Sequence, residues 1–228
     1  MHNIAYAFIP VAAVLVGALF AVWRKPGPGL ESALQHLAAG VVFGAAAAEI
    51  LPQVKHDASI WTTLVGGGLG VATMLLIKSV EGRWKGPLGM VTAIGIDILV
   101  DGLVLGLAFL AGAKAGLLMT IALTLEVLFL GLTVTTELGE YLSSRFKVIG
   151  ASVALALLLP VGVLAAMPVA SLPPHVIGGF LTFGLMALLY LVTEELLVEA
   201  HEKPDGPFTS AMFFVGFLGL LVIEELLG

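Results

Sequence analysis

Long apolar runs follow one another along almost the whole chain, and short turns rich in glycine and proline separate them. A helix needs about 20 mostly apolar residues to cross the hydrocarbon core of a bilayer. The intervening turns, such as RKPGPG, EGRWKGP and KPDGP, punctuate helices. The pattern therefore predicts eight transmembrane helices, at about residues 4–23, 33–52, 60–78, 88–111, 115–137, 148–167, 175–198 and 208–226.

No stretch between these runs is long enough for a soluble domain, so we expect residues 1–228 to form one all-α integral membrane domain. The composition agrees, because 59% of the residues are hydrophobic and only 11% are charged, against roughly 25% charged in soluble domains. The run at 4–23 follows no basic residue and is longer than the apolar part of a signal peptide, so we interpret it as a retained helix. The chain has no cysteine, which excludes thiolate metal sites, and no basic patch that would bind nucleic acid.

Basic residues gather on one side of the predicted bundle. With the N-terminus outside, only Lys55 and Lys114 fall in outer turns. The other eight fall on the cytoplasmic side, where membrane proteins retain Lys and Arg: Arg24, Lys25, Lys78, Arg83, Lys85, Arg145, Lys147 and Lys203. We therefore expect both termini to face the exterior, which an even number of spans permits.

Two acids, Asp97 and Asp101, interrupt the apolar stretch TAIGIDILVDGLVLGLAF at residues 92–109. Their spacing of four places them on one helix face. Glu126 falls at a similar depth in the next run, and the short turn AGAKAG favours packing of the two helices as neighbours. An acid at the middle of a membrane helix costs roughly 2.5–3.5 kcal/mol, and no Lys or Arg is expected at this depth. Bound cations or protons should therefore compensate these carboxylates.

Further acids lie above and below this level. Glu49 falls near the outer end of the second helix, and three acids fall near the inner end of the seventh: Glu194, Glu195 and Glu199. If their faces converge, these residues form a series of metal contacts across the membrane. We interpret the remaining membrane-edge acids as interfacial charges: Glu137, Glu140, Glu202, Glu224 and Glu225. His36 is interpreted as a packing or hydrogen-bonding residue, and no role is assigned to the other histidines: His2, His56, His175 and His201.

A short internal similarity links the second and seventh predicted helices. EILPQV at 49–54 and ELLVEA at 195–200 share an acid, two aliphatic residues and a Gln or Glu four positions later. One helix would run outward and the other inward, as in an inverted-topology repeat, and such repeats often place an ion site near the midplane.

Two stretches resemble the ZIP (Zrt/Irt-like) family of metal-ion transporters. HLAAGVVFGAAAAEILPQ at 36–53 is similar to that family's second helix, and LLYLVTEELLVEA at 188–200 is similar to its seventh. The resemblance implies eight helices in a three, two, three inverted arrangement, with both termini outside. It also implies passage of divalent metal ions toward the cytoplasm through the fourth and fifth helices.

The fourth and fifth helices depart from the family pattern. The family's His-Asn-x-Pro-Glu-Gly aligns with residues 97–102, where Asp97 and Asp101 retain ligand capacity. The family's His/Gln-Glu/Asp-x-Pro-Glu-Gly aligns with residues 126–131, where only Glu126 does. The two-metal centre of the family is thereby reduced to one candidate site.

Other departures affect the backbone and the surroundings of that site. Val100 and Phe129 replace the prolines of both motifs, so we expect straighter helices there. Leu159 stands where some relatives carry a glutamate, and the His-rich loop between helices three and four is reduced to KSVEGRWKGP.

A site of carboxylate oxygens suits Mn, Mg, Ca or Fe(II) better than Zn, although Zn stays among the candidate ions. Three carboxylates around one dication leave excess negative charge, so we expect one acid to be protonated part of the time and metal binding to release protons. The transported ion is the ligand, and no cofactor is expected.

The sequence favours a divalent metal transporter over two alternatives. A proton-linked carrier or channel could use the same acids without metal, and a non-transporting sensor could retain the fold. An enzyme is not expected, because neither HExxH nor a GxGD-like stretch is present. We expect a multi-pass protein of a prokaryotic inner or plasma membrane, with the lipid bilayer and divalent metal ions as partners. Whether it forms a homodimer stays open.

Overall fold

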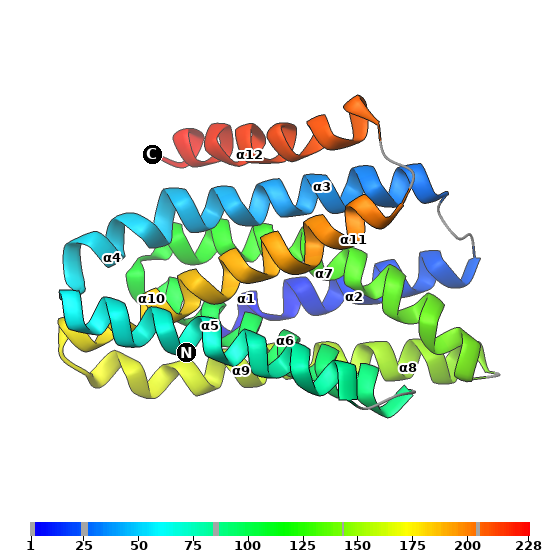
Figure 1. Cartoon of the computed structure of the whole chain (residues 1–228), viewed down its shortest axis with the longest axis horizontal. Helices are drawn as coiled ribbons and strands as arrows, with labels where there is room; N and C mark the ends of the chain where they lie inside the picture. The colour runs from blue at the N-terminus through cyan, green and yellow to red at the C-terminus, as the bar shows by residue number, and fades with distance from the viewer. Residues whose placement is uncertain (1–2, 24–26, 84–86, 143, 204–205) are drawn as a thin grey trace.

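All elements in the described residues are helices, and most run side by side along one axis (Figure 1). The structure is a computed structural model that describes residues 3–23, 27–83, 87–142, 144–203 and 206–228. In chain order the elements are α1 (Asn3–Tyr6), α2 (Phe8–Trp23), α3 (Pro28–Ala45), η1 (Ala46–Ile50), α4 (Leu51–Asp57), α5 (Ile60–Arg83), α6 (Pro87–Ala111), α7 (Ala113–Tyr141), α8 (Arg145–Ala156), α9 (Leu158–Ala166), η2 (Met167–Ser171), α10 (Pro174–Leu191), η3 (Val192–Leu196), α11 (Leu197–Glu202) and α12 (Pro207–Leu227).

The eight predicted spans are confirmed as helices that are long and apolar enough to cross a membrane. Within the described part of the chain they are Ile4–Trp23, Pro28–Asp57, Ile60–Ser79, Gly89–Ala111, Ala113–Gly139, Arg145–Ser171, Pro174–Glu202 and Pro207–Leu227. The second span continues to Asp57, five positions past the predicted end at residue 52, and the seventh begins at Pro174 and continues to Glu202.

The second span passes Pro52 because the helix widens just before it. In η1, the Leu51 N–H donates to the carbonyl of Ala46, five residues earlier, which makes one π turn. Pro52 then lies in the first turn of α4, directly after the π turn. The seventh span has the same feature in η3, where the Leu197 N–H donates to the Val192 carbonyl. Both π turns carry acids of the predicted series, and π turns occur frequently at functional sites.

Four pairs of helices make the most extensive contacts: α2 with α7, α3 with α12, α5 with α10 and α6 with α9. In each pair, a glycine lets two backbones approach so closely that a Cβ would overlap a carbonyl oxygen of the facing helix. The glycines and the facing carbonyls are Gly17 and Leu128, Gly40 and Phe213, Gly66 and Gly179, and Gly102 and Leu159. Small residues of this kind are the usual means of close helix packing in membranes.

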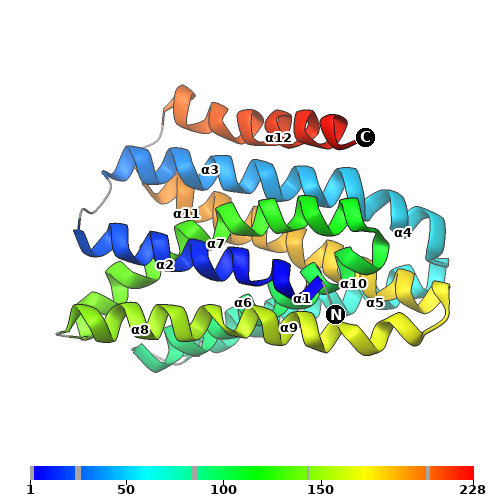
Figure 2. The same ribbon diagram turned by 180° about the vertical axis from the view of Figure 1, so that it is seen from behind.

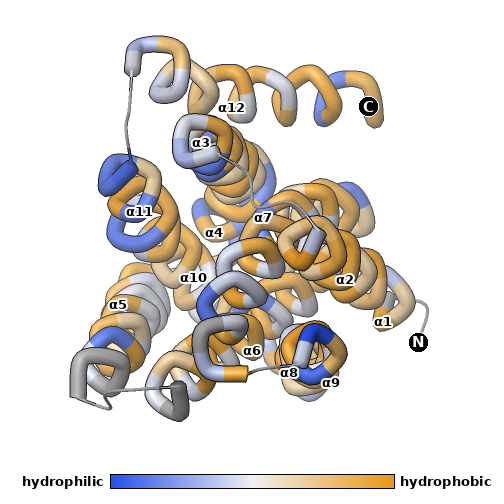
Figure 3. The backbone as a smooth tube through the Cα atoms, turned by 90° about the vertical axis from the view of Figure 1, so that its right-hand side faces the viewer, coloured by the Kyte–Doolittle hydropathy of each residue, from blue (hydrophilic) through white to orange (hydrophobic). Residues whose placement is uncertain are grey.

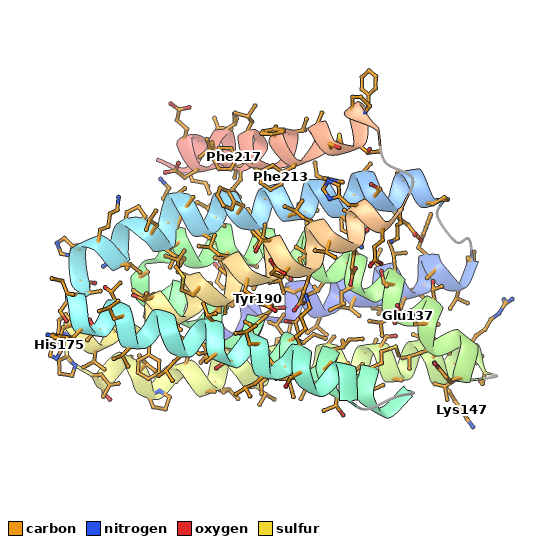
Figure 4. All side chains as sticks on the ribbon, viewed as in Figure 1. Glu137, Lys147, His175, Tyr190, Phe213 and Phe217 are labelled. Carbon is orange, nitrogen blue, oxygen red and sulfur yellow. The ribbon has the colours of Figure 1, made fainter. Side chains whose placement is uncertain are left out.

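The centre and the periphery of the bundle differ in burial. The spans in α6 and α7 are the most buried of the eight, and Figure 3 shows α7 surrounded by other helices. Seen from behind, α2 lies between α7 and the α8–α9 segment (Figure 2). The α12 helix lies on the outside along α3, where Phe213 and Phe217 place their rings 5.9 Å from the ring of Phe43 (Figure 4).

Candidate cation site

The three acids predicted at one depth meet between α6 and α7. Asp97, Asp101 and Glu126 each offer one oxygen, and these oxygens lie within 4.8 Å of one another. Asp101 and Glu126 are 2% and 3% exposed, and Asp97 is half-buried. The prediction that these three side chains meet is therefore confirmed, whereas their binding of a metal stays a prediction.

Local helix geometry explains this meeting. Asp97 and Asp101 lie one turn apart on α6, and a turn at Gly112 brings α7 back as an antiparallel neighbour. Both helices run without a break through Val100 and Phe129, as expected from the absence of proline at these positions. Unbroken helices carry no free backbone carbonyls at the cluster, so the ligand atoms available there come from side chains.

No cation of the protein compensates Asp101 or Glu126 among the described residues. The charges that act on Asp101 are those of Glu126 and Glu195, and the charges that act on Glu126 are those of Asp97 and Glu195. Asp101 Oδ2 and Glu126 Oε2 are buried, and neither has a hydrogen-bond partner within the described part of the chain. Two ionised carboxylates no more than 4.8 Å apart repel each other by at least about 3.5 kcal/mol at an effective dielectric constant of about 20. An empty, fully ionised cluster is therefore unfavourable.

The spacing of the three oxygens suits a single cation. Three atoms that lie no more than 4.8 Å apart all fall within about 2.8 Å of a common point, close to the roughly 2.3–2.6 Å of Ca–O bonds. A movement of less than about 1 Å would give the roughly 2.0–2.1 Å that Mg requires. The cluster can therefore hold one hard cation, which would replace repulsion among the acids by attraction.

The seventh span contributes a fourth acid to this region. Glu195, in η3, is half-buried and interacts electrostatically with both Asp101 and Glu126. Its neighbour Glu194 faces elsewhere, since 53% of its side chain is exposed and its Oε2 lies 3.9 Å from Lys78 Nζ. Lys78 also donates to the Glu194 carbonyl at 3.0 Å. Of these two consecutive acids, only Glu195 extends the cluster.

Glu49 belongs to a different group, near the start of α7. Its Oε1 lies 4.0 Å from Lys114 Nζ, and the same Nζ donates to Glu224 Oε1 of α12 at 2.9 Å. The side chain of Glu49 is 14% exposed. We call Glu49, Lys114 and Glu224 the lysine-bridged group. The structure therefore places Glu49 apart from the three central acids and beside a built-in cation.

Glu199 also lies apart from the centre. It accepts a hydrogen bond from Gln35 Nε2 of α3 at 2.8 Å, and Lys203 donates to Gln35 Oε1 at 3.1 Å. Lys203 further pairs with Glu31 at 3.1 Å. These contacts join the start of α3 to α11, so Glu199 is part of an interhelical polar network.

Sequence reasoning missed the partners in both networks away from the centre. Glu224 was interpreted as an interfacial charge, although it pairs with a lysine 110 positions away. Gln35 lies 164 positions from Glu199, and the sequence predicted no role for it. The predicted topology does put Lys114 and Glu224 near the same membrane face. That shared depth was the available signal, but it does not fix which way each side chain points.

The chain was compared with known proteins at the level of sequence. No protein-family model matches it, and no curated protein sequence matches it.

Proposed function

We propose that the protein transports divalent metal cations across a membrane through the cluster of Asp97, Asp101 and Glu126. The observation that carries this proposal is the convergence of three acids in the interior of the bundle, where Asp101 and Glu126 have no compensating lysine or arginine among the described residues. Ionisable residues inside a membrane domain are costly and usually mark ion or substrate pathways.

The arrangement of the helices supports a transporter built from an inverted repeat. The four closest helix pairs join the first span to the fifth, the second to the eighth, the third to the seventh and the fourth to the sixth. This set of pairs stays the same when the first span is exchanged with the sixth, the second with the seventh, the third with the eighth and the fourth with the fifth. The acidic π turns η1 and η3 occupy equivalent positions, in the second and seventh spans. Repeats of this type place ion sites at the interface between halves. We infer the three, two, three arrangement of the ZIP-like pattern from this exchange.

The distribution of basic residues supports a direction. Lys147 lies at the opposite end of the bundle from His175 (Figure 4), and Lys147 is one of the eight basic residues that the sequence assigns to a single side of the membrane. Because cytoplasmic turns retain Lys and Arg, that end would face the cytoplasm and both termini would face the exterior. A cation would then pass from the lysine-bridged group, through the centre, past Glu195 and into the cell.

The ligand set favours hard cations. The central cluster offers carboxylate oxygens and, among the described residues, no imidazole. Oxygen ligands favour Mn, Mg and Ca, with Fe(II) also suited, over Zn.

The proposal is tested by cation uptake into proteoliposomes that contain the purified protein. Parent, Glu126→Gln and a matched control, Glu137→Gln, are compared with Mn, Mg, Ca, Fe(II) and Zn as substrates. Glu137 lies on the same helix as Glu126 but is exposed. We expect Glu126→Gln to lower the flux by at least about tenfold, equivalent to about 1.4 kcal/mol, and Glu137→Gln to leave it near the parent value.

Proton flux, followed with a dye inside the same vesicles, identifies the competing function. Cation flux that depends on Glu126 supports the proposal. Proton flux that depends on Glu126 but not on any divalent cation would contradict it, and would show that the same acids serve a proton-linked carrier or channel. The absence of both fluxes in the folded parent would also contradict the proposal.

A further inference from the structure

The helices of the bundle form two groups. The first group contains α2, α6, α7, α8 and α9, and the second contains α3, α4, α5, α10, α11 and α12. In Figure 3, α5 and α11 of the second group lie on the left, and α2 and α9 of the first group lie on the right. Each of the four closest helix pairs, with the glycine that allows its backbone contact, lies inside one group. The boundary between the groups therefore runs between helices that contact each other less extensively than these four pairs.

The contacts of two glycines show how the boundary differs from the interior of a group. Inside the first group, a Cβ on Gly102 of α6 would overlap the carbonyl oxygen of Leu159 in α9. At the boundary, Gly184 of α10 faces α6, and a Cβ there would lie 3.3 Å from Cγ2 of Val104 and 3.7 Å from Cδ1 of Leu107. At this point the two groups meet through side chains rather than through interlocked backbones. Packed helices that meet in this way can slide by small amounts.

The ion pairs of Lys114 cross this boundary. Lys114 belongs to α7 of the first group, and its Nζ lies 2.9 Å from Glu224 Oε1 in α12 of the second group. The same Nζ lies 4.0 Å from Glu49 Oε1 in η1, the π turn between α3 and α4 of the second group. Two further ion pairs stay within the second group: Lys78 with Glu194, and Lys203 with Glu31. Lys114 therefore joins the two groups, at the end of the bundle that holds the turn between α6 and α7.

The helices that carry Lys114 and Glu224 do not themselves favour these charges. Lys114 lies in the first turn of α7, and Glu224 lies in the last turn of α12. The helix dipole favours acids in the first turn and basic residues in the last turn, so each charge is at the less favourable end of its own helix. The stabilisation of both charges therefore comes from the contact across the boundary.

Buried side chains lie below Lys114 on α7. Leu118 and Ala122 follow it by four and eight positions, which places them on roughly the same helix face, and both are 0% exposed. Glu126 of the central cluster lies 12 residues beyond Lys114, about 18 Å along the helix. A change at Lys114 therefore leaves the central acids untouched, while it alters what covers the face between them and the end of the bundle.

We propose that Lys114 is a latch, which holds the two helix groups together through Glu224 and Glu49 and keeps water from the face of α7 below it. Opening of this end requires the ammonium to leave both carboxylates, after which the groups can separate along their side-chain boundary. The latch itself rests on the contacts between the groups. Its role in admitting a cation from this end rests on the proposed transport function.

Water access to the face below Lys114 tests the latch. Because the chain has no cysteine, Leu118→Cys introduces a single thiol into the protein. Its rate of reaction with a water-soluble maleimide is measured on the purified full chain in lipid nanodiscs. We expect Lys114→Gln to speed this labelling by about fivefold, the ratio that corresponds to the roughly 1 kcal/mol of a partly exposed ion pair. Lys114→Arg retains the charge and should label like the Leu118→Cys background.

An exchange of charges separates the ion pair from the packing of the lysine side chain. Lys114→Glu places a third negative charge beside Glu49 and Glu224, so labelling should be faster than in Lys114→Gln. Addition of Glu224→Lys to Lys114→Glu restores a pair of opposite charges. We expect this double variant to return the labelling rate to within about twofold of the background, because residues in contact compensate each other's substitution.

A thiol inside the first group serves as the control. Val163 of α9 is 2% exposed, and labelling of Val163→Cys should not depend on Lys114. If Leu118→Cys does not fold, Ala122→Cys provides the second probe of the same face. The thermal unfolding of every variant is measured beside its labelling.

Each result supports or overturns the latch. Equal labelling in Lys114→Gln and the background overturns it, and so does a charge exchange that fails to restore the background rate. Equal acceleration at Val163→Cys also overturns it, because the whole bundle would then have loosened. Labelling that depends on the ion pair, in a protein whose parent shows no cation flux, retains the latch and overturns the proposed transport. Cation flux together with labelling that is independent of Lys114 does the reverse.

Discussion

The acids at the centre of the bundle and those of the lysine-bridged group are compensated in different ways. Glu49 and Glu224 share the ammonium of Lys114, which lies 4.0 Å from one and 2.9 Å from the other. Asp101 and Glu126 are more deeply buried, and the charges that act on them are all negative. In the lysine-bridged group an ammonium of the protein offsets part of the charge of two acids, whereas the central cluster has no such partner among the described residues and requires an added cation or protons.

The largest loss of Mn binding is expected when a lysine is introduced among the central acids, as in the lysine-bridged group. Glu126→Lys places an ammonium beside Asp97 and Asp101 and supplies the missing positive charge from the protein itself. We expect binding of Mn to the central cluster to fall by at least about a hundredfold, or about 2.8 kcal/mol, with the protein still folded. Calorimetry on the purified protein measures it. Retention of parent affinity would show that the cation binds elsewhere.

A smaller loss is expected from a neutral isostere. Asp101→Asn keeps the shape of the side chain and one oxygen but removes one negative charge from a 2% exposed position. We expect Mn affinity and uptake to fall by about tenfold, or 1.4 kcal/mol. Glu225→Gln, at the end of α12, is the matched surface control. An unchanged affinity in Asp101→Asn would remove this residue from the site.

Protons and cations should compete at the central cluster. Since a carboxylate that binds a metal has to be deprotonated, lower pH weakens cation binding, and cation binding releases protons. We expect release of about one proton per Mn bound, obtained from calorimetry in buffers of different ionisation enthalpy. In Glu126→Gln the number released should fall. Zero release in the parent would mean that the empty cluster holds no proton.

The smallest effect is expected from removal of the built-in cation. Lys114→Gln leaves Glu49 and Glu224 without their shared ammonium. A partly exposed ion pair is worth at most about 1 kcal/mol, so we expect uptake at low cation concentration to rise by roughly two- to fivefold. Lys114→Arg retains the charge and serves as the control. Reduced uptake in Lys114→Gln, with Lys114→Arg unaffected, would show that the lysine does not compete with the incoming cation.

The sequence was sufficient to predict the eight spans and the meeting of three acids. Apolar runs of about 20 residues determine the spans, and a spacing of four residues together with a shared depth brings Asp97, Asp101 and Glu126 together. The second span continues five residues beyond its predicted end because the helix passes Pro52 after the π turn, a feature that the apolar run alone does not reveal.

Helix rotation is the information that the sequence lacked. Depth placed Glu194 and Glu195 at one level, yet only Glu195 interacts with the centre, while Glu194 faces Lys78. The pairing of Lys114 with Glu224 and the contact of His36 with His201 depend on packing between distant segments. A single sequence does not locate the close helix approaches that set this packing, such as the one at Gly40 between α3 and α12.

The most direct test of the central claim is the position of Mn in crystals of the parent protein, located by anomalous scattering. The account predicts a Mn peak bounded by carboxylate oxygens of Asp97, Asp101 and Glu126, and its loss in crystals of Asp101→Asn grown under the same conditions. A parent structure in which Mn is bound elsewhere while these three carboxylates hold no ion would contradict the account.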